Sequence, residues 1–233
     1  MTSAPMPPDE SLRIDALRRA NILDTEPERE FDDLVQIAAH VCSTPIAVVS
    51  LIDVDRQWFK AKVGIDATET SREVSFCAHA ILGDEVLVVP DATRDSRFAH
   101  NPLVTADPHI RFYAGAPMLS PDGHPLGSLC VIDMVPHEIT PEQEHALAAL
   151  ARLARDHLVM RNHLAELKHL LAEVKTLEGI IPVCAWCKQV RDDDGYWGAV
   201  EQYLRDRVDV QITHGMCPTC VTKTRLDGVE SAP

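Results

Sequence analysis

The segment that begins at Thr140 is the sequence feature that most constrains the fold of this chain. Thr140 and Gln143 have the spacing of a capping box, and neither glycine nor proline occurs from Glu142 to Glu178. Apolar side chains recur there at alternating intervals of four and three residues, and one histidine takes a place in the series. The positions are Ala146, Leu150, Leu153, His157, Met160, Leu164, Leu167, Leu171 and Val174. Such a segment predicts one long helix with a coiled-coil register, which separates an N-terminal domain from a C-terminal tail.

Two arrangements of this helix are open. In the first, residues 146–174 pair with a second copy as a coiled coil and make the chain a homodimer, with His157 as a tolerated polar layer. In the second, the whole helix packs on its own domain, as the alanine-rich sequence ALAALARLA favours for the N-terminal half. We expect the dimeric coiled coil at least for the C-terminal half.

Charge and hydropathy exclude several classes of function. The 233 residues carry a formal net charge of −14, of which residues 1–139 account for −11. This disfavours binding to nucleic acid and to membrane surfaces, both of which need clustered cations. No apolar run is long enough to span a bilayer, and MTSAPMPPDE is unlike a secretory signal. We therefore expect a cytoplasmic protein with no nucleic-acid or membrane partner.

The residues before Thr140 predict an α+β fold. Residues 10–40 have helical periodicity, interrupted by a turn, and residues 75–83 predict a short helix. Strands are predicted at 45–53, 57–64, 85–92, 109–120 and 125–135, the last two joined by the turn sequence PDGH. The short connections indicate a largely antiparallel sheet of five or six strands, flanked by helices.

Four strings in this region carry a family resemblance. They are ETSREVSFCAHAIL (69–82), VVPDATRDSRFAHNPLV (88–104), IRFYAGAPM (110–118) and GSLCVID (127–133). Together they resemble the GAF domains of bacterial signalling proteins, in the subgroup with an FCAHAI-type motif, over about residues 10–155. The resemblance implies a sensor fold with helices on one side of the sheet and a ligand pocket on the other. It also implies that the following helix passes a change in the dimer to an output module.

The motif residues predict a ligand pocket in which a few polar groups lie among aromatic side chains. The candidates are Phe76, Cys77, His79, Asp91, Arg97, Phe98, Arg111 and Tyr113. The alternative is structural: Asp91 and Arg97 form an ion pair, and Cys77 is a small buried apolar residue. Cys42, Cys77 and Cys130 are far apart in sequence, and none matches a methionine sulfoxide reductase or a bilin-binding pattern.

Four cysteines near the C-terminus form two CxxC pairs separated by 29 residues: Cys184, Cys187, Cys217 and Cys220. Four thiolates suit tetrahedral zinc, so the spacing predicts a structural zinc site, with His214 as an alternate ligand. A redox dithiol, a haem or iron–sulfur group and no metal at all are the alternatives. The tail resembles a module with a CxxC…HGxCPxC pattern at the C-terminus of bacterial PAS, GAF and receiver proteins.

These expectations divide the chain into five parts. They are a flexible N-terminus (1–9), a GAF domain (10–139), a signalling helix (140–178), a zinc-binding module (179–224) and a flexible tail (225–233). No catalytic output motif is present, so we expect a sensory or regulatory protein rather than an enzyme, with a small molecule or a signalling protein as partner. The alternatives are a redox sensor or small reductase that uses the CxxC thiols or Cys77, and an interaction adaptor that binds no ligand.

Overall fold

The computed structural model describes residues 3–178, 182–191, 195–207, 213 and 215–226, so His214 lies outside the described residues. The chain divides into an N-terminal unit, residues 1–168, and a C-terminal unit, residues 169–233. The division falls within the long helix α5 (Pro141–Glu178).

Six strands of the N-terminal unit form one antiparallel sheet in the order β3-β2-β1-β6-β5-β4. Their bounds are β1 Ile46–Ile52, β2 Arg56–Val63, β3 Glu69–Ser71, β4 Leu87–Val89, β5 Phe112–Leu119 and β6 Pro125–Asp133. Five of these strands match the predicted segments, and β3 has no predicted counterpart. The α+β class and the antiparallel sheet are confirmed.

The central strands are held by continuous burial and by a close approach of two backbones. Every residue of β1 is buried, which agrees with its unbroken apolar run. A Cβ added at Gly127 of β6 would lie 1.9 Å from the carbonyl oxygen of Ser50, so only glycine permits this spacing. The β5–β6 turn closes where the PDGH sequence predicts it, with Ser120 N donating to His124 O over 2.7 Å.

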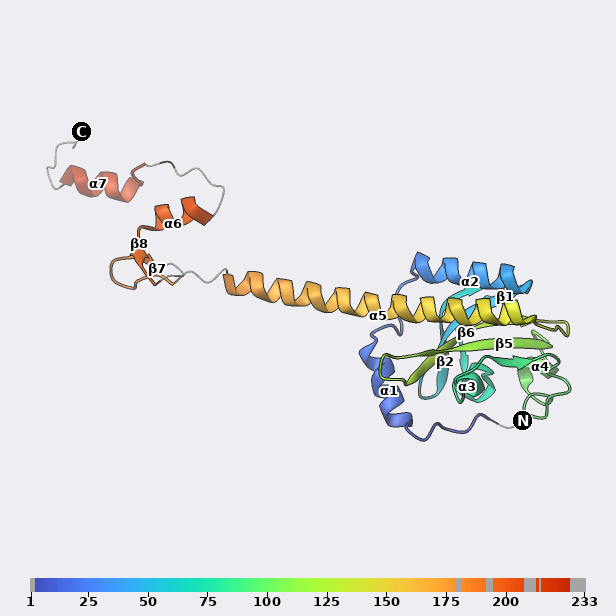
Figure 1. The fold of residues 1–233 in the computed structure, drawn as a ribbon. Coiled ribbons are helices and arrows are strands. Elements are labelled where there is room, and N and C mark those ends of the chain that lie inside the picture. Colours follow the sequence, from blue (N-terminus) through green and yellow to red (C-terminus); the bar gives the residue numbers. More distant parts are fainter. Residues whose placement is uncertain (1–2, 179–181, 192–194, 208–212, 214, 227–233) are drawn as a thin grey trace. The chain divides into compact units, whose positions relative to one another are not determined.

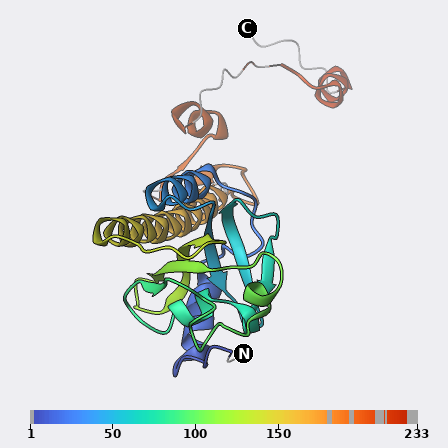
Figure 2. The same ribbon diagram turned by 90° about the vertical axis from the view of Figure 1, so that its right-hand side faces the viewer.

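Helices cover both faces of the sheet (Figures 1 and 2). Side chains of α1 (Glu10–Arg19), α2 (Arg29–Cys42) and α5 form one core with alternate residues of β1, β5 and β6. On the opposite face, α3 (Cys77–Ala80) and α4 (Pro102–Thr105) contribute to a second core. The short 3-10 helix η1 (Arg72–Val74) precedes α3 in the chain. The second face is therefore a packed core, although the family resemblance implied helices on one side only.

Helix α5 begins as the capping box predicts and then presents two apolar stripes. Thr140 N donates to Gln143 Oε1 (3.0 Å), and Gln143 N donates to Thr140 Oγ1 (3.3 Å). One stripe is buried in the first core and consists of Leu147, Leu150, Ala151, Ala154 and Leu158. The other is half or more exposed and consists of Leu153, Met160, Leu164, Leu167 and Leu171. At 3.6 residues per turn the two stripes lie about a third of a turn apart.

The two stripes divide the predicted heptad register. Leu150 belongs to the buried stripe, whereas Leu153, Met160 and the leucines that follow form the exposed one. His157 packs edge-on against Phe31 of α2, with ring centroids 4.9 Å apart. His157 therefore contacts the domain of its own chain, and its expected role as a polar layer of a coiled coil stays a prediction. The side chain of Val174 lies outside the described residues.

The C-terminal unit contains short elements. β7 (Val190–Arg191) and β8 (Trp197–Gly198) form an antiparallel hairpin, followed by α6 (Val200–Arg207) and α7 (Pro218–Leu226). Among the described residues, no helix combines the length and the apolar character that a bilayer span requires.

Candidate functional site

Five of the eight predicted ligand-binding residues meet around α3. The Ser75 hydroxyl accepts from Ala78 N (2.9 Å) and fixes the start of this single helical turn. The rings of Phe76 and Phe98 stack with their centroids 4.0 Å apart, and Tyr113 and His79 contact the same pair. Phe76, Cys77, Phe98 and Tyr113 are at most 3 % exposed, whereas His79 is half-buried. These side chains thus fill the space between α3 and the sheet.

The other three predicted residues make separate contacts at the surface. The Arg97 guanidinium pairs with Asp95, with Nη2 2.6 Å from Oδ2, so the alternative of an Asp91–Arg97 ion pair is wrong. Half-buried Asp91 accepts from Thr93 Oγ1 (2.6 Å), and this hydrogen bond holds the Asp91 pKa below its usual value. Arg111 donates to three main-chain carbonyls at 2.9–3.1 Å.

A surface cavity of ≈ 480 Å³ lies on the outer side of α3. Two of the predicted residues, His79 and Arg97, line it together with Leu82, Ser96 and the N-terminal residues around Pro5. A small molecule there would meet an imidazole and a guanidinium whose charge Asp95 already balances. Ligand binding at the predicted residues stays a prediction, and His79 and Arg97 are the two placed to take part in it.

A larger cavity of ≈ 530 Å³ lies on the other face, between the β4–β5 edge of the sheet and α5. Its apolar lining includes Val86, Met118 and Ala148, and its rim includes Glu144 and Arg152. Sequence reasoning missed this cavity. The signal that could have indicated it is the alanine-rich start of the helix, because alanine leaves space against a sheet.

The structure also brings together two cysteines that are 53 positions apart. Cys77 at the start of α3 and Cys130 of β6 have their Sγ atoms 3.5 Å apart. Both are fully buried, whereas Cys42 lies in the core on the opposite face. The alternative that Cys77 is a small buried residue agrees with its burial, but its contact with Cys130 was not predicted from the sequence.

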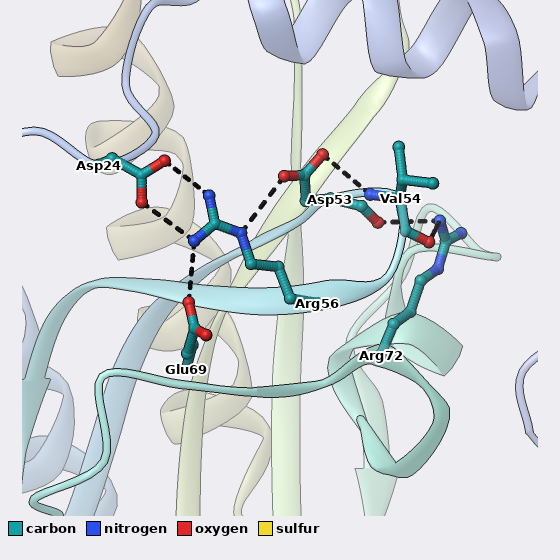
Figure 3. A network of polar contacts seen from close by, with 6 residues as sticks. All are labelled: Asp24, Asp53, Val54, Arg56, Glu69 and Arg72. Atoms are coloured by element: carbon teal, nitrogen blue, oxygen red, sulfur yellow. Dashed lines mark hydrogen bonds and ion pairs between the residues drawn. The ribbon is translucent and has the colours of Figure 1, made fainter.

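A polar network ties the outer strands to the loop before α2 (Figure 3). The Arg56 guanidinium binds the carboxylates of Asp24 (2.6 Å), Glu69 (2.8 Å) and Asp53 (3.4 Å). Arg72 donates to the carbonyls of Asp53 (3.0 Å) and Val54 (3.3 Å). Because Glu69 is in β3 and Arg72 follows it, the network holds this short edge strand in place.

A second network connects α5 to the GAF-like sheet. Glu28, the residue before α2, accepts from Lys60 Nζ of β2 (2.7 Å) and from Arg161 Nε of α5 (2.8 Å), and His157 Nε2 lies 3.8 Å away. The Lys60 side chain is completely buried. Burial would raise the pKa of Glu28, but the hydrogen bond and charge of Lys60 and the charge of Arg161 lower it overall. We call Glu28, Lys60, His157 and Arg161 the Glu28 cluster.

The first CxxC pair of the C-terminal unit folds as a tight turn, and the second lies at the start of α7; we call both of them knuckles. Cys184 O accepts from Lys188 N (3.0 Å), and Lys188 adopts a left-handed φ of 63°. Backbone N–H donors, first among them that of Cys187, lower the pKa of Cys184, and the N–H of Cys220 does the same for Cys217 at the start of α7. Cys184 is half-buried and the other three are exposed. Within the described residues no three potential ligands converge, so the zinc expectation stays a prediction.

Comparisons with known proteins agree with the fold. A family profile described as GAF domain matches residues 26–158. A cyclic di-GMP phosphodiesterase of Pseudomonas aeruginosa is 44 % identical over 155 residues, which are 66 % of this chain. The chain spans only 26 % of the length of that relative.

Solved structures of GAF domains also resemble the chain at low identity. The GAF domain of an Acinetobacter phosphoenolpyruvate-protein phosphotransferase is 16 % identical, with a TM-score of 0.48, and the alignment covers 66 % of this chain and 98 % of that one. The blue-light-absorbing PixJ GAF domain of Thermosynechococcus elongatus is 17 % identical, with a TM-score of 0.49 and coverages of 70 % and 96 %.

Proposed function

This chain belongs to the GAF domain family, and from that premise we propose that it is a sensory protein whose α5 transmits the state of the GAF domain within a homodimer. Family membership indicates a signalling or sensory role. The proposal adds a direction of transmission, from the sheet through α5 to the C-terminal unit, and a small molecule or a partner protein as the input.

The division of α5 into two stripes carries the proposal. Leu147, Ala154 and Leu158 belong to the core of the GAF domain, so a change in the sheet reaches the helix directly. Leu164 and Leu167 remain more than half exposed on the same helix. Exposed leucines at heptad spacing are stabilised when a second helix covers them, which favours pairing with a second copy.

The Glu28 cluster supports the same role. Its salt bridges join β2, α2 and α5, since Glu28 binds Lys60 and Arg161 at once. Arg161 also donates to the carbonyl of Asn21 (2.9 Å), and Asn162 donates to that of Arg19 (3.0 Å). A displacement of the sheet or of α2 would therefore also shift the middle of α5.

The similar segment of the Pseudomonas enzyme fits a modular role. The matched 155 residues are about a quarter of a protein named for cyclic di-GMP hydrolysis. We propose that the GAF domain of this chain likewise acts as a regulatory input and that catalysis is not its own activity.

An acidic substitution in the exposed stripe tests the dimer. Light scattering of the wild-type chain at tens of micromolar should give twice the 25.8 kDa chain mass, and Leu164→Asp should halve it. The neighbouring Ala165→Asp is the matched control, because Ala165 is exposed outside the stripe, and this variant should stay dimeric. Wild-type protein that is monomeric at this concentration would refute the proposal.

We propose that the two knuckles share one structural zinc ion. The donor set fits, because four cysteine thiolates satisfy tetrahedral zinc and the pKa values of Cys184 and Cys217 are already lowered by backbone N–H groups. The ion would hold the two knuckles together by coordination, in a segment with a small core of its own.

Metal analysis tests this part separately. Purified chain should contain about one zinc ion, and the double variant Cys184→Ser, Cys217→Ser should contain less than a third as much. Cys42→Ser is the control, since Cys42 is buried in the N-terminal unit, and its zinc content should match that of the wild type. Wild-type chain without zinc whose four tail thiols all react with a thiol reagent would exclude the site.

A further inference from the structure

The buried cysteine pair lies where a short helix meets the central sheet. Cys77 is the first residue of α3, and Cys130 lies in β6 opposite Val48 and Gly115. Their Sγ atoms are 3.5 Å apart, and a disulfide bond is about 2.05 Å long. The two sulfurs would have to approach by about 1.5 Å, which is a small movement for a helix of a single turn.

Polar groups are arranged around the Cys77 sulfur inside an otherwise apolar core. The Tyr113 hydroxyl donates to it over 3.3 Å, and Gln57 Nε2 donates over 3.5 Å. The Ser75 hydroxyl donates to Gln57 Oε1 and so fixes which end of the amide faces Cys77. The buried Ser128 hydroxyl has no hydrogen-bond partner in the described part of the chain. Buried donors without acceptors are costly, so these groups favour an anionic or oxygen-bearing sulfur at Cys77.

A glycine makes the tyrosine contact possible. A Cβ added at Gly115 would lie 2.1 Å from the Tyr113 hydroxyl oxygen, because the ring lies along β5 over that residue. The absence of a side chain at Gly115 thus leaves space for the Tyr113 ring to reach Cys77.

These surroundings change the ionisation of the pair in opposite directions. Burial alone would raise the pKa of Cys77, but hydrogen bonding, first with Cys130 and also with Tyr113, lowers it overall. The pKa of Cys130 is raised, because its thiol shares a hydrogen bond with Cys77 and because it is buried. Cys42 has only burial, which raises its pKa to about 11. A thiolate is the nucleophile in thiol oxidation, so Cys77 is the reactive member.

We infer that Cys77 and Cys130 form a reversible disulfide that a hydroperoxide closes and a dithiol reopens. The Cys77 thiolate attacks the peroxide, takes up one oxygen as a sulfenic acid and releases the alcohol or, from hydrogen peroxide, water. The Cys130 thiol then attacks the sulfenic sulfur, forming the S–S bond and releasing water. The protein loses two electrons and two protons in all, and the peroxide is reduced by those two electrons.

The bond would restrain the part of the domain that holds the predicted ligand residues. Phe76 directly precedes α3 and His79 lies within it. His79 also lines the cavity on the outer side of this helix. Joining Cys77 to β6 would fix α3 against the sheet. Because both sulfurs are buried, closure requires brief opening of α3 and will be slower than oxidation of the exposed tail thiols.

Peptide mapping of the full chain tests the inference without any substitution. Tryptic cleavage places Cys77 in residues 73–94, Cys130 in 112–152 and Cys42 in 30–56, one cysteine in each. After hydrogen peroxide and alkylation under denaturing conditions, peptides 73–94 and 112–152 should appear as one cross-linked species that dithiothreitol separates. The peptide with Cys42 should stay alkylated. The oxidised chain should also unfold at a midpoint roughly 5–10 °C higher.

Two further outcomes decide the inference. In Cys130→Ser, peroxide should leave Cys77 as a sulfenic acid that a 1,3-dione reagent captures, whereas the wild type should show little capture. If Cys77 and Cys130 stay alkylated to the same degree as Cys42, or if disulfides form only within the tail, the inference is wrong. None of these readouts depends on the dimer or on zinc. The proposed disulfide can therefore be confirmed or refuted independently of the proposed function.

Discussion

Replacing Glu28 with alanine is expected to lower the free energy of unfolding by about 3–5 kcal/mol. The reason is the completely buried side chain of Lys60, whose ammonium would lose its carboxylate partner at 2.7 Å. The remaining acceptors, the Thr25 hydroxyl and the Glu26 carbonyl, carry no charge. Denaturant unfolding at neutral pH, followed by circular dichroism, measures the loss.

The cluster offers a control and a compensating variant. Glu30→Ala changes an exposed carboxylate in the first turn of the same helix and should cost less than about 0.5 kcal/mol. Adding Lys60→Met to Glu28→Ala removes the unpaired charge, so the double variant should be more stable than Glu28→Ala alone. Equal losses for Glu28→Ala and Glu30→Ala would show that the cluster does not join α5 to the sheet.

A second large effect is expected at Glu10, and it depends on pH. The Glu10 carboxylate binds two buried guanidinium groups, those of Arg13 (2.8 Å) and Arg72 (2.5 Å). Burial opposes ionisation of Glu10, but the hydrogen bonds and charges of these arginines lower its pKa from 4.5 to about 2. The difference corresponds to about 2–4 kcal/mol of stability in favour of the folded state.

The direction of the Glu10 pKa shift determines how its contribution to stability changes with pH. Because the pKa is lower in the folded state, the contribution is complete above pH 4.5 and is lost as the pH falls from about 4.5 towards 2. Glu10→Gln should therefore be less stable than the wild type at pH 7, and the difference should shrink below pH 4.5. Unfolding curves from pH 7 to pH 3 measure it, with Asp15→Asn, an exposed change in the same helix, as control. A difference that does not vary with pH would contradict this account.

Local patterns were sufficient to predict most of the sheet. The apolar run of β1 and the PDGH turn between β5 and β6 are each short, local signals, and the structure confirms both. Strand β2 also forms where it was predicted, although its residues 57–61 are all buried. The three-residue strand β3 was not predicted, because long-range partners form it: β2 supplies its hydrogen bonds and Arg56 binds Glu69.

Long-range placement limited the prediction of the candidate site. Periodicity indicates that α5 has apolar side chains at heptad spacing, but only the position of the sheet decides that Leu150 faces inward while Leu153 faces outward. In the same way, nothing near Cys77 in the sequence points to Cys130, because the register of β6 and the packing of α3 bring them together. The contact of Arg97 with Asp95 rather than Asp91 depends on a turn whose geometry the residue types do not fix.

The strand order has a consequence for how copies of this domain can associate. The sheet ends in β3 and β4, each of only three residues, and Pro90 directly after β4 has no N–H to donate. A sheet edge recruits another chain through a row of unpaired main-chain groups, and edges this short offer few of them. Edge-to-edge growth into larger sheets is therefore disfavoured, and self-association is left to side chains on helices.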